Sequence, residues 1–161
     1  MAKTIFYGVM SLDGFLAGQN DDMSWAEKYL SNDQDYGWME LVQSCGAVLM
    51  GRKTFEFEMK NAPDLDRMLP TYVLTSQPLR FDGVSPENLQ FTSGDLKAVI
   101  PNIMAKHPGD LFIGGGAQLV EGLLQDGLLD QLELFIAPDV LGRGVRLFQD
   151  PNLTTSFEVL K

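Results

Sequence analysis

The chain has 161 residues, of which 45% are hydrophobic, and a formal net charge of −10. This length favours one domain with a single core over residues 1–161, and no run approaches the roughly 20 apolar residues of a membrane-spanning helix, so we expect no membrane partner. The 12 Lys and Arg are scattered, unlike the basic stripe that nucleic acid requires, and no His, Cys or carboxylate cluster has the spacing of a metal site.

Residues 4–12 form a nearly continuous apolar run with aromatic and β-branched members, which predicts a strand covered on both faces. Because no signal-peptide pattern precedes this strand, we expect a cytoplasmic protein. Turn residues predict a long loop over 13–22, and apolar residues at helical spacing predict a helix over 35–43. A second strand is expected at 47–50.

The second strand runs through Gly51 into the start of a helix that carries Arg52, Lys53 and Thr54. Arg offers a planar fork to phosphate oxygens, Lys a mobile charge and Thr a hydroxyl donor, so the segment is a candidate anion site. A solvated basic turn with Thr54 as the helix cap is the alternative.

Two further strands are expected at 72–75 and 88–91, followed by a helix over 95–106. Thr75 and Ser76, at the end of the first of these strands, carry small hydroxyls that could hold a ribose or its phosphate. An ordinary turn would have the same composition.

Residues 111–113 form a short apolar strand that passes through Gly114, Gly115 and Gly116 into a helix that begins at Ala117. Glycines let the backbone approach an anion, and the start of the following helix offers free N–H groups and the positive end of its dipole. The run predicts a phosphate site, with a plain strand-to-helix turn as the alternative. It lacks the Lys-Ser/Thr of a P-loop and the glycine spacing of the dinucleotide fingerprint.

The remaining elements are a helix over 117–125, a strand over 130–138 and a last strand over 156–160. Strands and helices alternate, which predicts an α/β layered domain with a mostly parallel sheet whose last strands can pair antiparallel. Ligands of such sheets bind beyond the carboxyl ends of the strands. The chemistry is therefore expected where strands end, just after Leu12, Met50, Thr75 and Ile113.

Five segments have an order and spacing that go beyond these single motifs: SLDGFLA (11–17), MSW (23–25), LMGRKTFE (49–56), FIGGG (112–116) and LELFIAPDVLG (132–142). With them the chain resembles the dihydrofolate reductase-like family, most closely its branch shared with the C-terminal reductase domain of bacterial riboflavin biosynthesis. The resemblance covers nearly the whole chain.

The resemblance implies a three-layer dihydrofolate reductase-like fold, with a mostly parallel mixed central sheet, helices on both faces, and NADPH as cofactor. By the same resemblance, the loop from Gly18 to Trp25 would act as a mobile lid. The implied cofactor contacts are Gly51, Arg52, Lys53 and Thr54 on phosphates, Thr75 and Ser76 near the adenosine ribose 2′-phosphate, Gly114, Gly115, Gly116 and Ala117 around the pyrophosphate, and Val9, Leu16 and Ala17 along the nicotinamide.

The resemblance also implies hydride transfer to a small heterocycle, either a pterin or an aminopyrimidine of the riboflavin pathway. Dihydrofolate reductases carry a carboxylate soon after the Trp, whereas the simplest alignment gives Leu30 at that position. Asp33 is our candidate for a substrate-contacting acid. A helix cap or a solvated loop carboxylate is its alternative role.

Relatives of the riboflavin type are commonly dimers, which implies a homodimer with Leu134, Phe135 and their neighbours across a twofold axis. Arg143 and Arg146, in a glycine-containing connection, could hold a substrate phosphate or simply lead to the last strand. The rival function is a non-catalytic nucleotide-binding module of the same fold, which would bind the cofactor without turnover.

Overall fold

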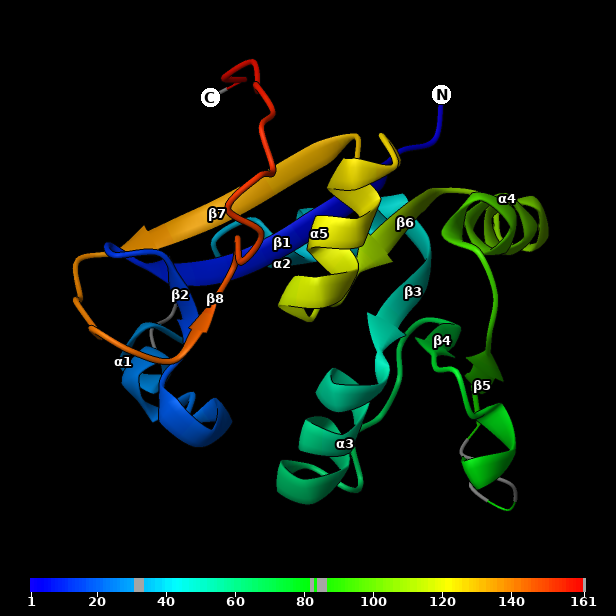
Figure 1. Ribbon diagram of the computed structural model, residues 1–161. Helices are drawn as coiled ribbons and strands as arrows, with labels where there is room; N and C mark the ends of the chain where they lie inside the picture. The colour runs from blue at the N-terminus through cyan, green and yellow to red at the C-terminus, as the bar shows by residue number, and fades with distance from the viewer. Residues whose placement is uncertain (31–33, 82, 84–86, 161) are drawn as a thin grey trace.

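The centre of the molecule is a six-stranded sheet in the order β5-β4-β3-β6-β1-β7, in which every pair of neighbouring strands is parallel (Figure 1). The structure is a computed structural model that describes residues 1–30, 34–81, 83 and 87–160. The strands of this sheet are β1 (Thr4–Ser11), β3 (Cys45–Gly51), β4 (Thr71–Leu74), β5 (Leu89–Thr92), β6 (Asp110–Ile113) and β7 (Gln131–Ala137).

One face of the sheet is covered by α4 (Leu96–Lys106) and α5 (Ala117–Gln125). Side chains alternate between the two faces of a strand, so Phe6, Leu49 and Ile113 come together on this face with the buried side chains of both helices. This packing forms the larger apolar core of the molecule.

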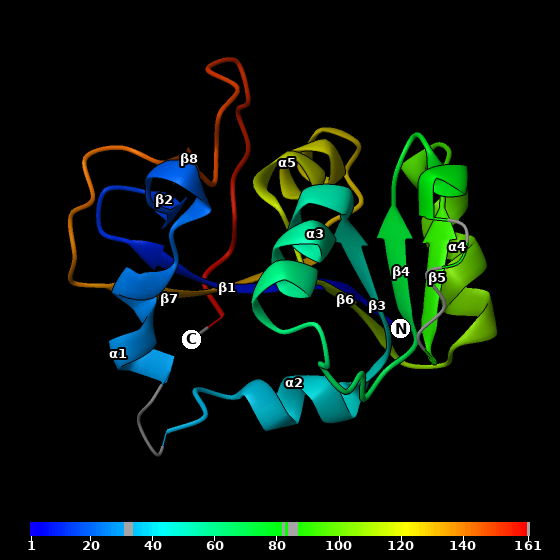
Figure 2. The ribbon, with the colours of Figure 1, turned by 90° about the horizontal axis from the view of Figure 1, so that it is seen from below.

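The opposite face is covered by α2 (Trp38–Ser44) and α3 (Arg52–Asn61). Leu41 of α2 and Phe55 of α3 are buried there, the latter beside Met50. Figure 2 shows α2 and α5 on opposite sides of the strands. Helices on both faces make three layers, so the α/β layered arrangement predicted from the sequence is confirmed.

A two-stranded antiparallel ribbon stands apart from the main sheet, and the sequence did not predict it. It pairs β2 (Phe15–Ala17) with β8 (Val145–Arg146). Gly144 precedes β8 with a φ of +142°, and a Cβ at that position would lie 2.0 Å from the carbonyl oxygen of Ala17. Only glycine therefore fits where the chain enters the ribbon. The short elements nearby are η1 (Gln19–Asp21), η2 (Ser24–Ala26) and α1 (Glu27–Leu30), with η3 (Pro78–Phe81) on the other side.

The last strand predicted at 156–160 is not formed, and that prediction is wrong. Residues 154–160 are exposed and belong to no strand. An extended segment becomes a strand only when a neighbour accepts and donates its backbone hydrogen bonds, and this segment projects beyond the sheet (Figure 1). The antiparallel pairing expected of the last strands is therefore not formed, and β7 pairs parallel to β1. The antiparallel pair of the described residues is the β2–β8 ribbon, which lies outside the six-stranded sheet.

Among the helices of the described chain, none has the length and apolar character needed to cross a membrane.

Candidate functional site

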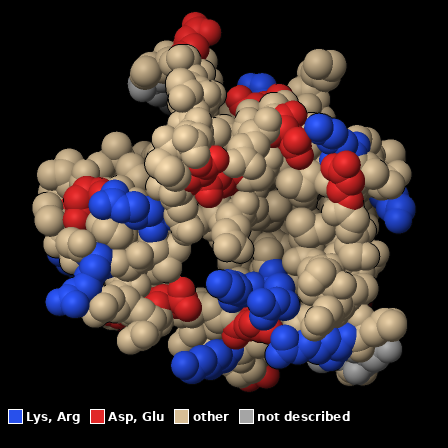
Figure 3. Space-filling model, viewed as in Figure 1, with Lys and Arg blue, Asp and Glu red and all other residues tan. Residues whose placement is uncertain are grey.

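A cavity of about 1240 Å³ opens at the carboxyl ends of the parallel strands. Its wall includes Val9 of β1, Gly51 at the end of β3, Thr75 after β4 and Gly114 after β6. These positions meet because the carboxyl ends of parallel strands lie at one edge of a sheet. Figure 3 shows the hollow, with Lys and Arg side chains on its rim over α3.

Two helices begin at this edge with a glycine as N-cap, Gly51 for α3 and Gly116 for α5. Neither start has a side-chain cap or an acidic residue in its first turn. The first N–H groups of a helix have no partner within it, so both helices present free donors and positive dipole ends to a ligand. The Gly51 N–H donates to the Gly115 carbonyl at 2.7 Å, which fixes the two turns side by side.

The turn between β6 and α5 consists of three glycines, two of which lie close to neighbouring side chains. A Cβ on Gly116 would lie 3.3 Å from Oγ1 of Thr54, and one on Gly114 would lie 3.4 Å from Cβ of Met50. Gly115 has a φ of +89°, and its peptide bond to Gly116 is cis. The bare backbone of this turn can therefore come into direct contact with an anion.

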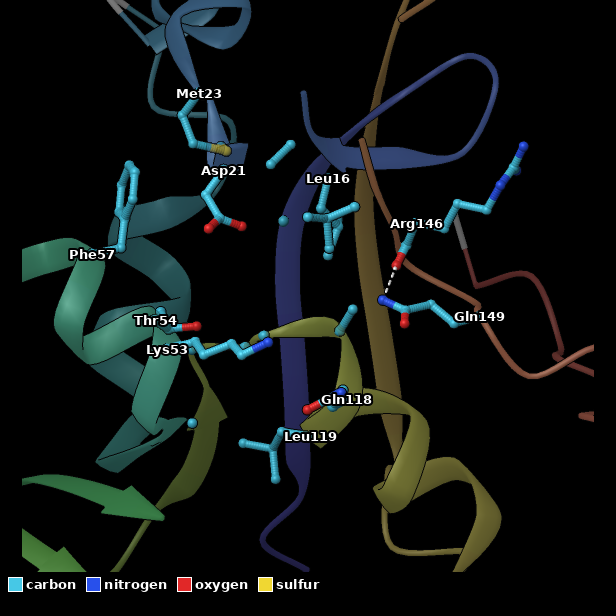
Figure 4. Close-up of a pocket in the computed structure, with 18 of the residues that line it drawn as sticks. Leu16, Asp21, Met23, Lys53, Thr54, Phe57, Gln118, Leu119, Arg146 and Gln149 are labelled. Carbon is cyan, nitrogen blue, oxygen red and sulfur yellow. Dashed lines mark hydrogen bonds between the residues drawn. The ribbon is translucent and has the colours of Figure 1, made fainter. Parts of the chain in front are cut away.

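Cationic residues occur on two sides of the cavity, and their side chains point in different directions. On α3, Nη1 of Arg52 lies 2.7 Å from Oε2 of Glu56, whereas Lys53 forms no ion pair with any described residue and points into the cavity (Figure 4). Across the cavity, the Arg146 guanidinium lies 4.4 Å from the centroid of the Phe15 ring. Figure 4 shows this side chain turned away from the cavity, which favours a connecting role for Arg146 over phosphate binding.

Asp13 holds the loop that follows β7 against the wall of the cavity. Its carboxylate accepts hydrogen bonds from the Ser11 hydroxyl at 2.6 Å, the Gly142 N–H at 2.7 Å and the Leu141 N–H at 3.1 Å. These bonds, that of Ser11 first, lower the pKa of Asp13 to about 2. The carboxylate is therefore ionised at neutral pH and keeps all three donors.

A second carboxylate, Asp139, ties α1 to the same loop. Nζ of Lys28 lies 2.8 Å from Oδ1 of Asp139, and the Tyr29 hydroxyl donates to Oδ2. The hydrogen bond from Lys28, followed by that from Tyr29, lowers the pKa of Asp139, and the bonds to Asp139 raise the pKa of Lys28 and of Tyr29. The segment that follows the predicted lid is thereby anchored.

The structure places every residue predicted to contact the cofactor in the lining of this one cavity. From the predicted lid, Asp21 and Met23 also line it. Asp33, the predicted acid, lies outside the described residues. The residues predicted to contact the cofactor, all of which line the cavity, are Val9, Leu16, Ala17, Gly51, Arg52, Lys53, Thr54, Thr75, Ser76, Gly114, Gly115, Gly116 and Ala117. Their roles toward a cofactor stay predictions.

Sequence reasoning missed Phe57 and Gln149, which also line the cavity (Figure 4). Phe57 follows Lys53 by four residues, so helical spacing places both on one face of α3 and could have identified it. Gln149 reaches the cavity only because the chain returns past α5 after β8, where the buried Glu121 accepts its backbone N–H at 3.0 Å. No local motif signals that return. Within the described parts of the chain, no group of three or more His, Cys, Asp or Glu could hold a metal ion.

Comparison with known sequences identifies one protein family and two related bacterial proteins. A sequence model of the family described as the RibD C-terminal domain matches residues 2–161. The uncharacterized protein YwjB of Bacillus subtilis (strain 168) is 28% identical over 149 residues, which cover 92% of this chain and 83% of YwjB. The uncharacterized protein YyaP of the same organism is 32% identical, with 88% and 77% covered.

Comparison with solved structures gives the same fold. A protein named for riboflavin biosynthesis from Shewanella sp. PV-4 has a TM-score of 0.85 at 26% identity, covering 99% of this chain and 90% of its own. The Thermotoga maritima diaminohydroxyphosphoribosylaminopyrimidine deaminase/5-amino-6-(5-phosphoribosylamino)uracil reductase has a TM-score of 0.71 at 15% identity, covering 99% and 52%. Enterococcus faecalis dihydrofolate reductase complexed with NADP(H) has a TM-score of 0.65 at 15% identity, covering 92% and 79%. The dihydrofolate reductase-like fold predicted from the sequence is thus confirmed.

Proposed function

The chain belongs to the RibD C-terminal domain family, and from that premise we propose that it is an NADPH-dependent reductase of a small heterocycle of the pterin or aminopyrimidine type. Proteins of similar fold include reductases, one of them solved with NADP(H). The observation that carries the proposal is the pair of glycine-capped helix starts, joined by the hydrogen bond from Gly51 to Gly115, in one cavity with Arg52 and Lys53.

The cavity suits a large anionic ligand despite the net charge of −10. Its volume of about 1240 Å³ exceeds the roughly 300–1,000 Å³ of most small-molecule sites, which leaves room for a dinucleotide and a second small ligand. We assign the pyrophosphate to the turn at Gly114–Gly116, where backbone donors act locally. Arg52 and Lys53 supply compensating charge, and Thr75 supplies a hydroxyl beyond them for a ribose phosphate.

The part of the cavity beside β1 and β2 is apolar, and we assign the nicotinamide ring to Val9, Leu16 and Ala17. When bound, NADPH supplies a hydride to an electron-poor carbon of the substrate. The protein's own side chains orient the ring and exclude water from it. We assign the accompanying proton to solvent or to Asp33.

Calorimetric titration with NADPH and with NADH tests the proposal. We expect NADPH to bind more tightly than NADH, and Arg52→Ala to weaken NADPH binding about tenfold, because a charge-assisted contact to phosphate is lost. Lys60→Ala removes a cation from the last turn of α3, outside the described lining, and should leave the affinity unchanged.

Absence of NADPH binding at about millimolar concentration would contradict the assignment, since affinities weaker than that have little use in a cell. Turnover is then measured as oxidation of NADPH in the presence of pterins and aminopyrimidines. Binding without oxidation on either class would indicate the non-catalytic nucleotide-binding module instead.

A further inference from the structure

One carboxylate of the cavity is left without a protein partner. Asp21 and Glu58 are the acidic side chains of the described lining. Oε2 of Glu58 lies 2.9 Å from Nη2 of Arg67, whose side chain is only 7% exposed, so Glu58 is engaged. Asp21 makes no hydrogen bond or ion pair with any residue that the structure describes, and its carboxylate points into the cavity (Figure 4). Asp21 is therefore free to bind a ligand.

The backbone of the lid loop turns Asp21 toward the cavity. Asn20 and Asp21 have φ of +57° and +59°, a left-handed conformation that Asn and Asp adopt more readily than other side chains. The Gly18 N–H donates to the Asp22 carbonyl at 2.8 Å, and the Asp22 carboxylate accepts the Ser24 N–H at 3.0 Å. Asp22 thus stabilises the loop, whereas Asp21 takes no part in holding it.

The surroundings of Asp21 suit a flat ring. Leu16 from β2, Met23 from the lid and Phe57 from α3 lie around it, while Lys53 lies across the cavity (Figure 4). Apolar walls can hold the two faces of a planar heterocycle, and a carboxylate at its edge can accept hydrogen bonds from N–H groups.

We propose that Asp21 determines which substrate is accepted, by binding an amino-substituted nitrogen heterocycle through adjacent N–H donors on one edge of its ring. This inference rests on the proposed reductase function and names the edge by which that substrate is recognised. An ionised carboxylate offers only acceptors, so it binds a ring N–H beside an exocyclic amino group and repels an edge of carbonyl oxygens or a phosphate. A site built for such donors rejects an isostere that lacks them, because its polar group is then left unpaired.

Asp21→Asn tests this in the NADPH-saturated protein in weakly acidic buffer. There 2,4-diaminopyrimidine is protonated on a ring nitrogen, so it offers a ring N–H beside an amino group and serves as the donor-edge probe. Uracil is the probe with carbonyl oxygens in place of the amino groups. We expect the Kd of diaminopyrimidine to rise about tenfold or more and its preference over uracil to be lost. The affinity for NADPH should stay within about twofold of the wild type, because Asp21 is assigned to the substrate and not to the phosphates.

Glu27→Gln is the matched control, since it removes an exposed carboxylate at the start of α1, outside the described lining, and should leave the preference between the probes unchanged. The thermal midpoint of each variant confirms that it is folded.

An unchanged preference in Asp21→Asn would overturn the inference. An equal loss of NADPH affinity would do the same, because Asp21 would then act on the cofactor through Lys53. If the wild type binds no NADPH, the proposed reductase function is contradicted independently of Asp21. Titration of both probes without cofactor then still tests whether Asp21 determines the preference between them. A wild type with no preference for diaminopyrimidine rejects the assignment.

Discussion

The carboxylate of Asp13 joins two loops that border the cavity, and it makes stability depend on pH in the acid range. Its folded pKa of about 2 lies below its ordinary value of 3.8, so the unfolded chain takes up the proton first as the pH falls. The stability that this carboxylate contributes is therefore fully present above the pKa of Asp13 in the unfolded chain. It is lost as the pH falls toward the pKa of Asp13 in the folded protein.

We accordingly expect Asp13→Asn to unfold at a lower temperature than the wild type near neutral pH, and the difference to shrink between about pH 5 and about pH 2. Thermal unfolding followed by circular dichroism measures this. Asp64→Asn, at an exposed position that forms no hydrogen bond in the described structure, controls for the loss of one charge. A difference that stays constant over the whole range would show that the Asp13 carboxylate does not carry this stability.

Among the elements, the β2–β8 ribbon requires glycine at one position, Gly144. A Cβ at Gly144 would lie 2.0 Å from the Ala17 carbonyl oxygen, whereas Gly142, with a φ of +75°, has open space around it. We expect Gly144→Ala to lower the free energy of unfolding by roughly 2 kcal/mol or more, and Gly142→Ala by about 1 kcal/mol from backbone strain alone. Urea unfolding measures both. Equal losses would mean that the ribbon relaxes around the added methyl group.

The elements that could be predicted are those with local signals. The apolar run of β1 and the span of α5 between Gly116 and Gly127 are visible in the sequence itself. The ribbon is not, because β2 and β8 have three and two residues and pair across most of the chain. The strand predicted at 156–160 has the composition of a strand but has no neighbouring strand to pair with. The prediction failed because local sequence does not specify which segments pair.

The candidate site divides in the same way. The glycine turns and the cations beside them follow strands directly, so their place at one sheet edge could be deduced from strand order. The positions of Asp21 and Gln149 in the cavity could not be deduced from the sequence. Asp21 is turned toward the cavity by a loop with left-handed backbone conformation, and Gln149 reaches it because the chain returns past α5.

At the scale of the whole molecule, β7 forms one edge of the sheet, and Ile136 on it is 54% exposed. Phe135 packs against Tyr36 of its own chain, with ring centroids 4.6 Å apart, which leaves Ile136 as the better candidate for a contact between subunits. We expect a homodimer that Ile136→Glu converts to a folded monomer, because a charge in an apolar contact is costly. Sedimentation velocity measures the oligomeric state.

Leu79→Glu is the control for this test, since Leu79 is 78% exposed and lies on η3, at the other end of the sheet from β7. The variant should sediment like the wild type. A monomeric wild type, or a dimer that survives Ile136→Glu, would place β7 outside any subunit interface.

The hydrogen bond from Gly51 to Gly115 joins the turns that follow β3 and β6, two neighbouring strands of the sheet. A ligand that touches both turns meets donors that are already in place, so little of its binding free energy goes into ordering them. Asp21, by contrast, stands on a loop whose own hydrogen bonds are local. We therefore expect that substitutions in this loop change which substrate is preferred, whereas the two turns proposed to bind the cofactor keep their arrangement.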